Sequence, residues 1–207
     1  KTEGQNWVWH GADCLAPTYT RCLVSLSPGG TDSDVVREWD RTTGRFVADG
    51  FALPQAKSAV VWENADTLLV ATDYGEGSMT ASGYPRIVKR WRRGTPLASA
   101  TVVAEGEASD VGINPIAIDD GKTRWVLIAR NKSFYTSDYS IRAADGAGFV
   151  PAPIPDTADL SDVIGGQAII FLNKPADGFG EGSLVALSLA DAAAGRPQAG
   201  HGVCEGA

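Results

Sequence analysis

Four apolar segments recur along the chain at nearly regular intervals. Their first residues lie 46, 58 and 43 positions apart. The segments are residues 22–27, 68–73, 126–131 and 169–174. After a loop, each is followed by a second extended segment, at residues 35–40, 86–91, 139–144 and 183–189. A repeat of roughly 40–50 residues built from short strands is typical of a β-propeller blade, which buries its apolar face only against neighbouring blades.

The repeat divides the 207 residues into four predicted units of antiparallel strands. Their approximate bounds are 6–53, 54–107, 108–155 and 156–198. The second unit is the clearest, because its segment 67–72 is apolar enough to be buried on both faces. We therefore predict an all-β fold, a single segment of about four propeller-like blades that forms part of a larger protein. Residues 199–207 have few apolar groups, and we predict that they form a mobile tail.

The charge of the chain argues against a nucleic-acid partner. The formal net charge is −7 and the pI is near 4.8, whereas binding to phosphates requires a basic surface. The basic run at residues 89–93 is better explained as the solvated face of a strand that enters a turn. No apolar run approaches the length of about 18–20 residues that crosses a membrane.

Three cysteines give an indication of the compartment. Cys14 and Cys22 flank a turn-like connection, and an antiparallel hairpin would bring them within disulfide range. A structural disulfide in an exported protein and two reduced thiols both remain open, so a periplasmic or secreted location is favoured only weakly. The chain begins at Lys1 rather than Met, and we expect either that processing removed a preceding segment or that the chain is a fragment.

Two glycine-containing loops resemble catalytic motifs only superficially. A serine-hydrolase elbow requires Gly two residues on either side of Ser, between a strand and a helix. The position two residues after Ser78 is Thr80, and a strand is predicted to follow. A phosphate-binding loop would lead into a helix, whereas a predicted strand follows loop 178–182. Both segments are predicted to be ordinary loops.

The remaining reactive residues form no recognisable centre. A catalytic triad needs a histidine, and the chain has only His10 and His201, which together with Cys14 and Cys22 lack the spacing of a zinc site. Most carboxylates fall in predicted turns, where they bond nearby amides. These are Asp32, Asp34, Asp110, Asp119, Asp120, Asp159 and Asp162. We assign no catalytic, metal-binding or cofactor-binding residue and expect no cofactor, although a glycosidase-like carboxylate pair stays open as an alternative.

The first half of the chain contains several distinctive motifs. The main ones are DYGEGSMTASGYPRIVK at 73–89 and RGTPL at 93–97. Shorter ones are NWVW at 6–9, CL at 14–15, RCLVSLS at 21–27 and VREWD at 36–40. In these motifs the chain resembles the propeller of bacterial prolyl oligopeptidase-family serine peptidases. The likeness is detailed over about residues 6–105 and architectural beyond them.

The resemblance implies a parent protein with two domains. In that family a seven-bladed propeller covers an α/β-hydrolase domain with a Ser-Asp-His triad, and it admits only short peptides, which are cut after proline. The chain holds about four blades and no hydrolase domain. The resemblance therefore implies a non-catalytic gate for short proline-containing peptides, inactive as a peptidase by itself, whose partner is the hydrolase domain of the same protein.

Two other functions remain open from the sequence. One is a stand-alone secreted propeller that binds a ligand without peptidase activity, and the other is a small all-β hydrolase that uses a carboxylate pair. A partial propeller also exposes apolar sheet faces at both ends. We therefore expect the isolated segment either to self-associate through exposed blade edges or to close into a smaller ring.

Overall fold

The computed structural model describes residues 4–196 and 200–204, and over these residues it contains four antiparallel sheets. Sheet 1 comprises β1 (Trp7–Cys14), β2 (Arg21–Pro28), β3 (Asp34–Asp40), β4 (Arg45–Phe46) and β5 (Ala52–Ala56). Sheet 2 comprises β6 (Ala59–Asn64), β7 (Thr67–Ala71), β8 (Ile87–Arg92) and β9 (Thr101–Glu105).

The other two sheets repeat the same plan. Sheet 3 comprises β10 (Gly112–Asp119), β11 (Arg124–Asn131), β12 (Ser137–Arg142) and β13 (Phe149–Pro151). Sheet 4 comprises β14 (Ala158–Ile164), β15 (Gln167–Leu172), β16 (Leu184–Ser188) and β17 (His201–Cys204). The helical pieces are a 3-10 turn at Leu97–Ser99 and the five-residue helix α1 (Leu189–Ala193). The predicted all-β fold of about four blade-like units is confirmed.

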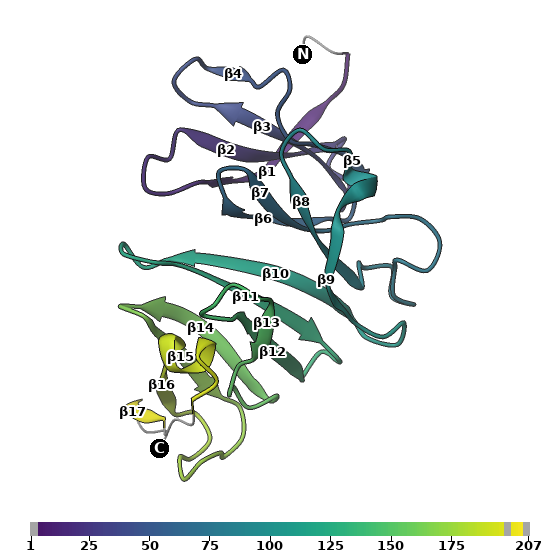
Figure 1. Ribbon diagram of the computed structural model, residues 1–207. Helices are drawn as coiled ribbons and strands as arrows, with labels where there is room; N and C mark the ends of the chain where they lie inside the picture. The colour runs from purple at the N-terminus through teal and green to yellow at the C-terminus, as the bar shows by residue number, and fades with distance from the viewer. Residues whose placement is uncertain (1–3, 197–199, 205–207) are drawn as a thin grey trace.

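The four sheets are stacked face to face in chain order, with sheet 1 at one end of the stack and sheet 4 at the other (Figure 1). Within each sheet the strands follow one another as an antiparallel meander, and β5 adds to β3 at the edge of sheet 1. The described residues therefore form an open stack, and the smaller closed ring that the sequence left open does not form.

Two strands lie across the expected limits of the units. β5 extends past residue 53, because its last residue Ala56 pairs with Asp34 of β3. β17 forms where a mobile tail was predicted, since His201 pairs with Ala186 and Cys204 with Leu184. Residues 201–204 thus belong to sheet 4, because an edge strand needs only backbone hydrogen bonds and no apolar side chains of its own. Residues 205–207, also assigned to the tail, lie outside the described residues.

The second strand of each inner sheet is buried on both faces. Every residue of β7 is buried. Its alternate side chains enter two cores: Leu68 and Val70 pack toward sheet 1, and Leu69 and Ala71 pack toward sheet 3. Because side chains alternate along a strand, a run without polar residues can fill two interfaces at once. The prediction that segment 67–72 is buried on both faces is confirmed.

Three hydrophobic cores lie between the four sheets. The first contains Trp62, against which Phe51 packs edge to face with ring centroids 5.7 Å apart. The second centres on residues of β7, β10 and β11, and the third joins β11 and β12 to sheet 4 and α1. Each interface therefore has its own core, and stability is expected to be the sum of terms between neighbouring sheets.

We predict that Leu68→Ala lowers the free energy of unfolding by about 2–5 kcal/mol, because Leu68 is fully buried between sheets 1 and 2 and the shortened side chain leaves a cavity. The measurement is urea unfolding followed by tryptophan fluorescence. Val102→Ala is the matched control: Val102 is 54% exposed on β9, so its loss should change stability by less than about 0.5 kcal/mol. Equal effects of the two substitutions would contradict the burial of Leu68 in the core between sheets 1 and 2.

Candidate functional site

The loops gather on two opposite faces of the stack. One, the hairpin face, carries the turns between first and second strands: residues 15–20, 65–66, 120–123 and 165–166. The other, the connection face, carries the loops between second and third strands: residues 29–33, 72–86, 132–136 and 173–183. The links from one sheet to the next also lie on the connection face, because the first strand of each sheet begins there and the last strand ends there.

The longest loop of the connection face joins β7 to β8 (Figure 1). Hydrogen bonds and ion pairs of side chains hold it in place. Tyr74 donates its hydroxyl to the carbonyl of Val70 at 2.7 Å, and burial raises the pKa of this phenol. The ammonium of Lys89 lies 4.0 Å from the centre of the Tyr74 ring. Arg86 donates from Nε to the carbonyl of Gly77 at 2.6 Å and forms an ion pair with Glu105. The loop is therefore a fixed part of the surface.

Ser78 stabilises this loop from within. Its side chain is buried, accepts a hydrogen bond from the amide of Tyr74 at 2.8 Å and donates to the carbonyl of Gly75 at 2.6 Å. The loop continues through a short bridge between Met79 and Pro85 into the strand β8. A serine whose hydroxyl is committed to backbone groups in this way closes a turn.

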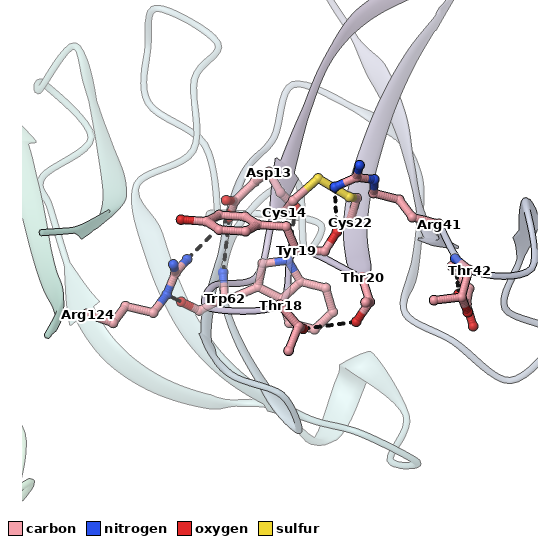
Figure 2. The surroundings of a disulfide bond; sticks show 11 residues. Asp13, Cys14, Thr18, Tyr19, Thr20, Cys22, Arg41, Thr42, Trp62 and Arg124 are labelled. Carbon is pink, nitrogen blue, oxygen red and sulfur yellow. Dashed lines mark hydrogen bonds and ion pairs between the residues drawn. A yellow bond between two sulfur atoms is a disulfide. The ribbon is translucent and has the colours of Figure 1, made fainter. Parts of the chain in front are cut away.

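On the hairpin face, three sheets are joined by a polar clamp that consists of Asp13, Trp62 and Arg124 (Figure 2). The indole N–H of Trp62 in sheet 2 donates to the carbonyl of Asp13 in sheet 1 at 3.0 Å. Arg124 in sheet 3 donates from Nε to the carbonyl of Trp62 at 2.8 Å, and its Nη2 lies 3.5 Å from the Asp13 carboxylate. Burial raises the pKa of Asp13, and the charge of Arg124 opposes this effect.

A second polar contact joins sheets 1 and 2 through a fully buried carboxylate. Glu38 on β3 accepts two hydrogen bonds from the guanidinium of Arg93, at 2.8 and 3.1 Å, and one from the amide of Phe51 at 2.9 Å. These contacts with Glu38 raise the pKa of Arg93. Glu63 on β6 binds Arg90 in the same two-pronged manner, at 2.7 and 2.8 Å. Most of the basic run 89–93 thus serves packing between elements, whereas Arg92 points outward and is exposed.

The two cysteines of the first hairpin form a disulfide (Figure 2). Cys14 at the end of β1 pairs directly with Cys22 on β2. Next to it, Arg41 donates to the carbonyl of Tyr19 at 3.0 Å, which ties the hairpin turn to the residue that follows β3. The disulfide therefore closes the end of sheet 1 that carries Asp13.

The other residues singled out in the sequence lie apart from one another. His10 contacts Asp34 at 2.7 Å on sheet 1, while His201 lies on β17 of sheet 4. Loop 178–182 leads into the strand β16. Among residues 4–196 and 200–204, no group of three or more His, Cys, Asp or Glu side chains has the arrangement of a metal site. No helix in the same part of the chain has the length and hydropathy of a membrane span.

The outer faces at both ends of the stack expose apolar side chains. On sheet 1, Trp9 is 61% exposed and lines a groove together with the half-buried Leu26, Trp39 and Phe46, and the buried Val24 lies at its floor. On sheet 4, Ile164 and Phe171 are exposed. In an inner sheet, such an apolar face is covered by the neighbouring sheet. The two outer faces of the stack therefore have the composition of an interface between blades.

The known proteins that this chain resembles are peptidases. No protein-family model matches the chain. An uncharacterized peptidase of Sinorhizobium fredii is 36% identical over 178 residues, which are 84% of this chain and 24% of the relative. A post-proline cleaving enzyme from Rickettsia typhi superposes with a TM-score of 0.87 at 23% identity, over all of this chain and 32% of that one. The chain is related to a bacterial peptidase and has the fold of the propeller region of prolyl oligopeptidases.

Oligopeptidase B from Leishmania major shows the same fold at greater distance, with a TM-score of 0.67 and 12% identity over 99% of this chain and 27% of that one. The chain thus spans about a quarter to a third of the length of the proteins that it matches. The resemblance that the sequence motifs indicated is confirmed, since a fragment of a prolyl oligopeptidase-family protein fits these findings.

Sequence reasoning did not find the polar clamp. Asp13, Trp62 and Arg124 belong to three different units, and the separation of 49 residues between Asp13 and Trp62 gives no local signal. Their contacts arise only when the sheets are stacked. In contrast, the aromatic pair Phe134 and Tyr135, which the sequence patterns also did not single out, could have been found from its place in a loop between two predicted strands.

We predict that Asp13 and Arg124 are energetically coupled. In a double-mutant cycle with Asp13→Ala and Arg124→Ala, the interaction energy should be about 0.5–3 kcal/mol, the usual range for side chains that share a network. The measurement is chemical unfolding of the four proteins. A cycle between Asp13 and Arg196, which lies in an ion pair with Asp191 at the other end of the stack, is the control and should give a value near zero. An equally small value for Asp13 and Arg124 would refute the clamp.

Stability should also depend on pH through Asp120 on the hairpin face. Its carboxylate accepts hydrogen bonds from the Trp125 indole and from the amides of Thr123 and Lys122, and these lower the pKa of Asp120 to about 2. Since the pKa in the folded state lies below the ordinary aspartate value of 3.8, the stabilisation is present above that pH and is lost as the pH falls toward 2.

The test compares wild type with Asp120→Asn by urea unfolding from pH 7 down to pH about 3. The difference in unfolding free energy should be constant near neutrality and should shrink once the pH falls below the ordinary pKa of an aspartate. Trp125→Phe removes the first of the three donors and should weaken the dependence on pH. A difference that stays constant throughout would contradict this assignment.

Proposed function

We propose that the four sheets form part of a propeller wall that controls by size which peptides reach a separate α/β-hydrolase domain of the same protein. The substrates of the whole protein are short peptides that are cleaved after proline. The observation that carries the proposal is the overlap of the whole chain with one part of a post-proline cleaving enzyme.

The exposed apolar faces of sheets 1 and 4 favour a propeller that has further blades beyond these four sheets. The groove around Trp9 on sheet 1 and the exposed Ile164 and Phe171 on sheet 4 have the composition of blade interfaces. In a complete propeller further sheets would cover both faces, and the first strands of the blades would line a central channel. A peptide that enters through such a channel must fit between these strands.

The contacts between sheets support a role as a rigid wall. A barrier that selects by size must resist opening, and here each interface combines an apolar core with charged pairs such as Glu38 with Arg93. The polar clamp connects sheets 1, 2 and 3 at the hairpin face, so that the two interfaces between these sheets share one set of contacts. Loosening the clamp should therefore admit larger substrates.

The experiment uses the full-length peptidase. Wild type should hydrolyse a short proline-containing peptide and leave a long unfolded proline-containing polypeptide almost intact. Arg124→Ala should raise the long-to-short ratio of kcat/KM by about fivefold to thirtyfold, because loss of about one or two kcal/mol of contact between the sheets raises the open population by that factor.

The matched control is Arg92→Ala, since Arg92 is an exposed arginine at the end of β8 outside the clamp. It should leave the ratio unchanged. Wild-type protein that cleaves both substrates equally would overturn gating by size, and wild-type protein that cleaves neither would overturn the proposed activity.

A further inference from the structure

The two most exposed large hydrophobic side chains among the described residues are neighbours in the sequence. Phe134 is 87% exposed and Tyr135 is 86% exposed. They form the tip of loop 132–136, which joins β11 to β12 on the connection face. Two adjacent aromatic rings without cover are costly to keep in water, and such groups are enriched at the centres of protein interfaces.

The loop that carries this pair is ordered by local hydrogen bonds. The amide of Lys132 donates to the carbonyl of Thr136 at 2.9 Å, and the hydroxyls of Ser133 and Thr136 lie 2.8 Å apart. The amide of Tyr135 donates to the Ser133 hydroxyl at 3.1 Å. A partner that binds a loop already fixed in this way loses little conformational entropy, so the aromatic tip is suited to act as an anchor.

The base of the loop is held by two ion pairs of one lysine. The ammonium of Lys132 lies 2.7 Å from the carboxylate of Asp138 and 3.1 Å from that of Asp156. A hollow beside the two rings is lined by Thr157, Asn173 and Lys174 from the edge of sheet 4. The anchor therefore stands on a surface formed jointly by sheets 3 and 4.

The position of the pair indicates what covers it. Every sheet starts its first strand and ends its last strand on the connection face, so a chain that continues from either end of the stack continues from this face. The relatives that the chain matches are three to four times as long as the matched segment. A domain linked to the stack at one or both ends is held close to the connection face by its linkers, at a high effective concentration.

We propose that Phe134 and Tyr135 are the anchor by which the sheets dock on the hydrolase domain of the same protein, an inference that rests on the two-domain organisation in the proposed function. The complementary surface is an apolar pocket that receives both rings and offers a hydrogen-bond acceptor to the Tyr135 hydroxyl. Docking here closes the connection face and leaves the hairpin face, with its clamp, toward solvent.

Two other occupants are distinguishable by experiment. A peptide substrate would cover the rings only when it is bound. A second copy of the chain would cover them only above a threshold protein concentration. The covalently linked domain is favoured over both because it is always present beside this face.

The test measures cysteine labelling in the full-length protein, in a background that combines Cys204→Ser with replacement of any other free cysteine by serine. Lys174→Cys places a reporter in the hollow beside the anchor without altering the anchor, and Ala147→Cys places a matched reporter on an exposed loop of the hairpin face. A maleimide dye should label the Lys174→Cys site about tenfold or more slowly than the Ala147→Cys site, as expected for a covered interface core.

Adding Phe134→Ala and Tyr135→Ala should bring the labelling rate at the Lys174→Cys site to within about threefold of that at the Ala147→Cys site, because truncation of anchor residues opens the interface. Both substitutions affect exposed side chains, so the fold should persist, and circular dichroism monitors it. Similar rates at the two sites before these substitutions would overturn the proposal, as would protection that needs added proline peptide or that disappears on dilution.

Turnover of a short proline peptide by the same preparations separates the two proposals. Normal turnover with an unprotected Lys174→Cys site removes the docking assignment and leaves the proposed function standing. Absence of turnover in protein that carries only Cys204→Ser removes the proposed function, whatever the labelling shows.

Discussion

The packing of each sheet against two neighbours is the constraint on which the rest of the structure depends. A strand such as β7 has no polar face, so it is stable only when a sheet lies on either side of it. Sheet-on-sheet contact then fixes the order of the stack, and the meander within each sheet fixes which loops share a face. The same constraint explains why the outer faces of sheets 1 and 4 remain apolar: their composition is that of an interface.

The charged groups between the sheets add contacts that depend on the relative position of the sheets. A buried carboxylate such as Glu38 would be costly by itself, and it is tolerated because Arg93 and the amide of Phe51 satisfy both of its oxygens. Such pairs require one relative position of the two sheets, whereas apolar surfaces tolerate small shifts. The clamp and the Glu38 contacts therefore determine the register between sheets, and a wall that selects molecules by size needs a fixed register.

The two loop faces have different roles in this arrangement. The hairpin face holds the disulfide and the clamp, which join neighbouring elements of the stack. The connection face holds the long loop after β7 and the aromatic pair in loop 132–136, both of which are ordered but directed outward. The connection face also joins sheets, through the ion pair of Lys132 with Asp156, and under the docking proposal it is in addition the side that meets another domain.

The sequence by itself determined the class of fold, the number of sheets and the family. Strand alternation and turn residues are local signals, and the motif at 73–89 is specific to the family, so none of these needed long-range information. The tertiary structure alone decided that β5 and β17 join their sheets, because edge strands form through backbone hydrogen bonds that leave little trace in side-chain pattern. It also decided the meeting of Asp13, Trp62 and Arg124, since contacts between residues about 50 to 60 positions apart depend on the twist and spacing of stacked sheets.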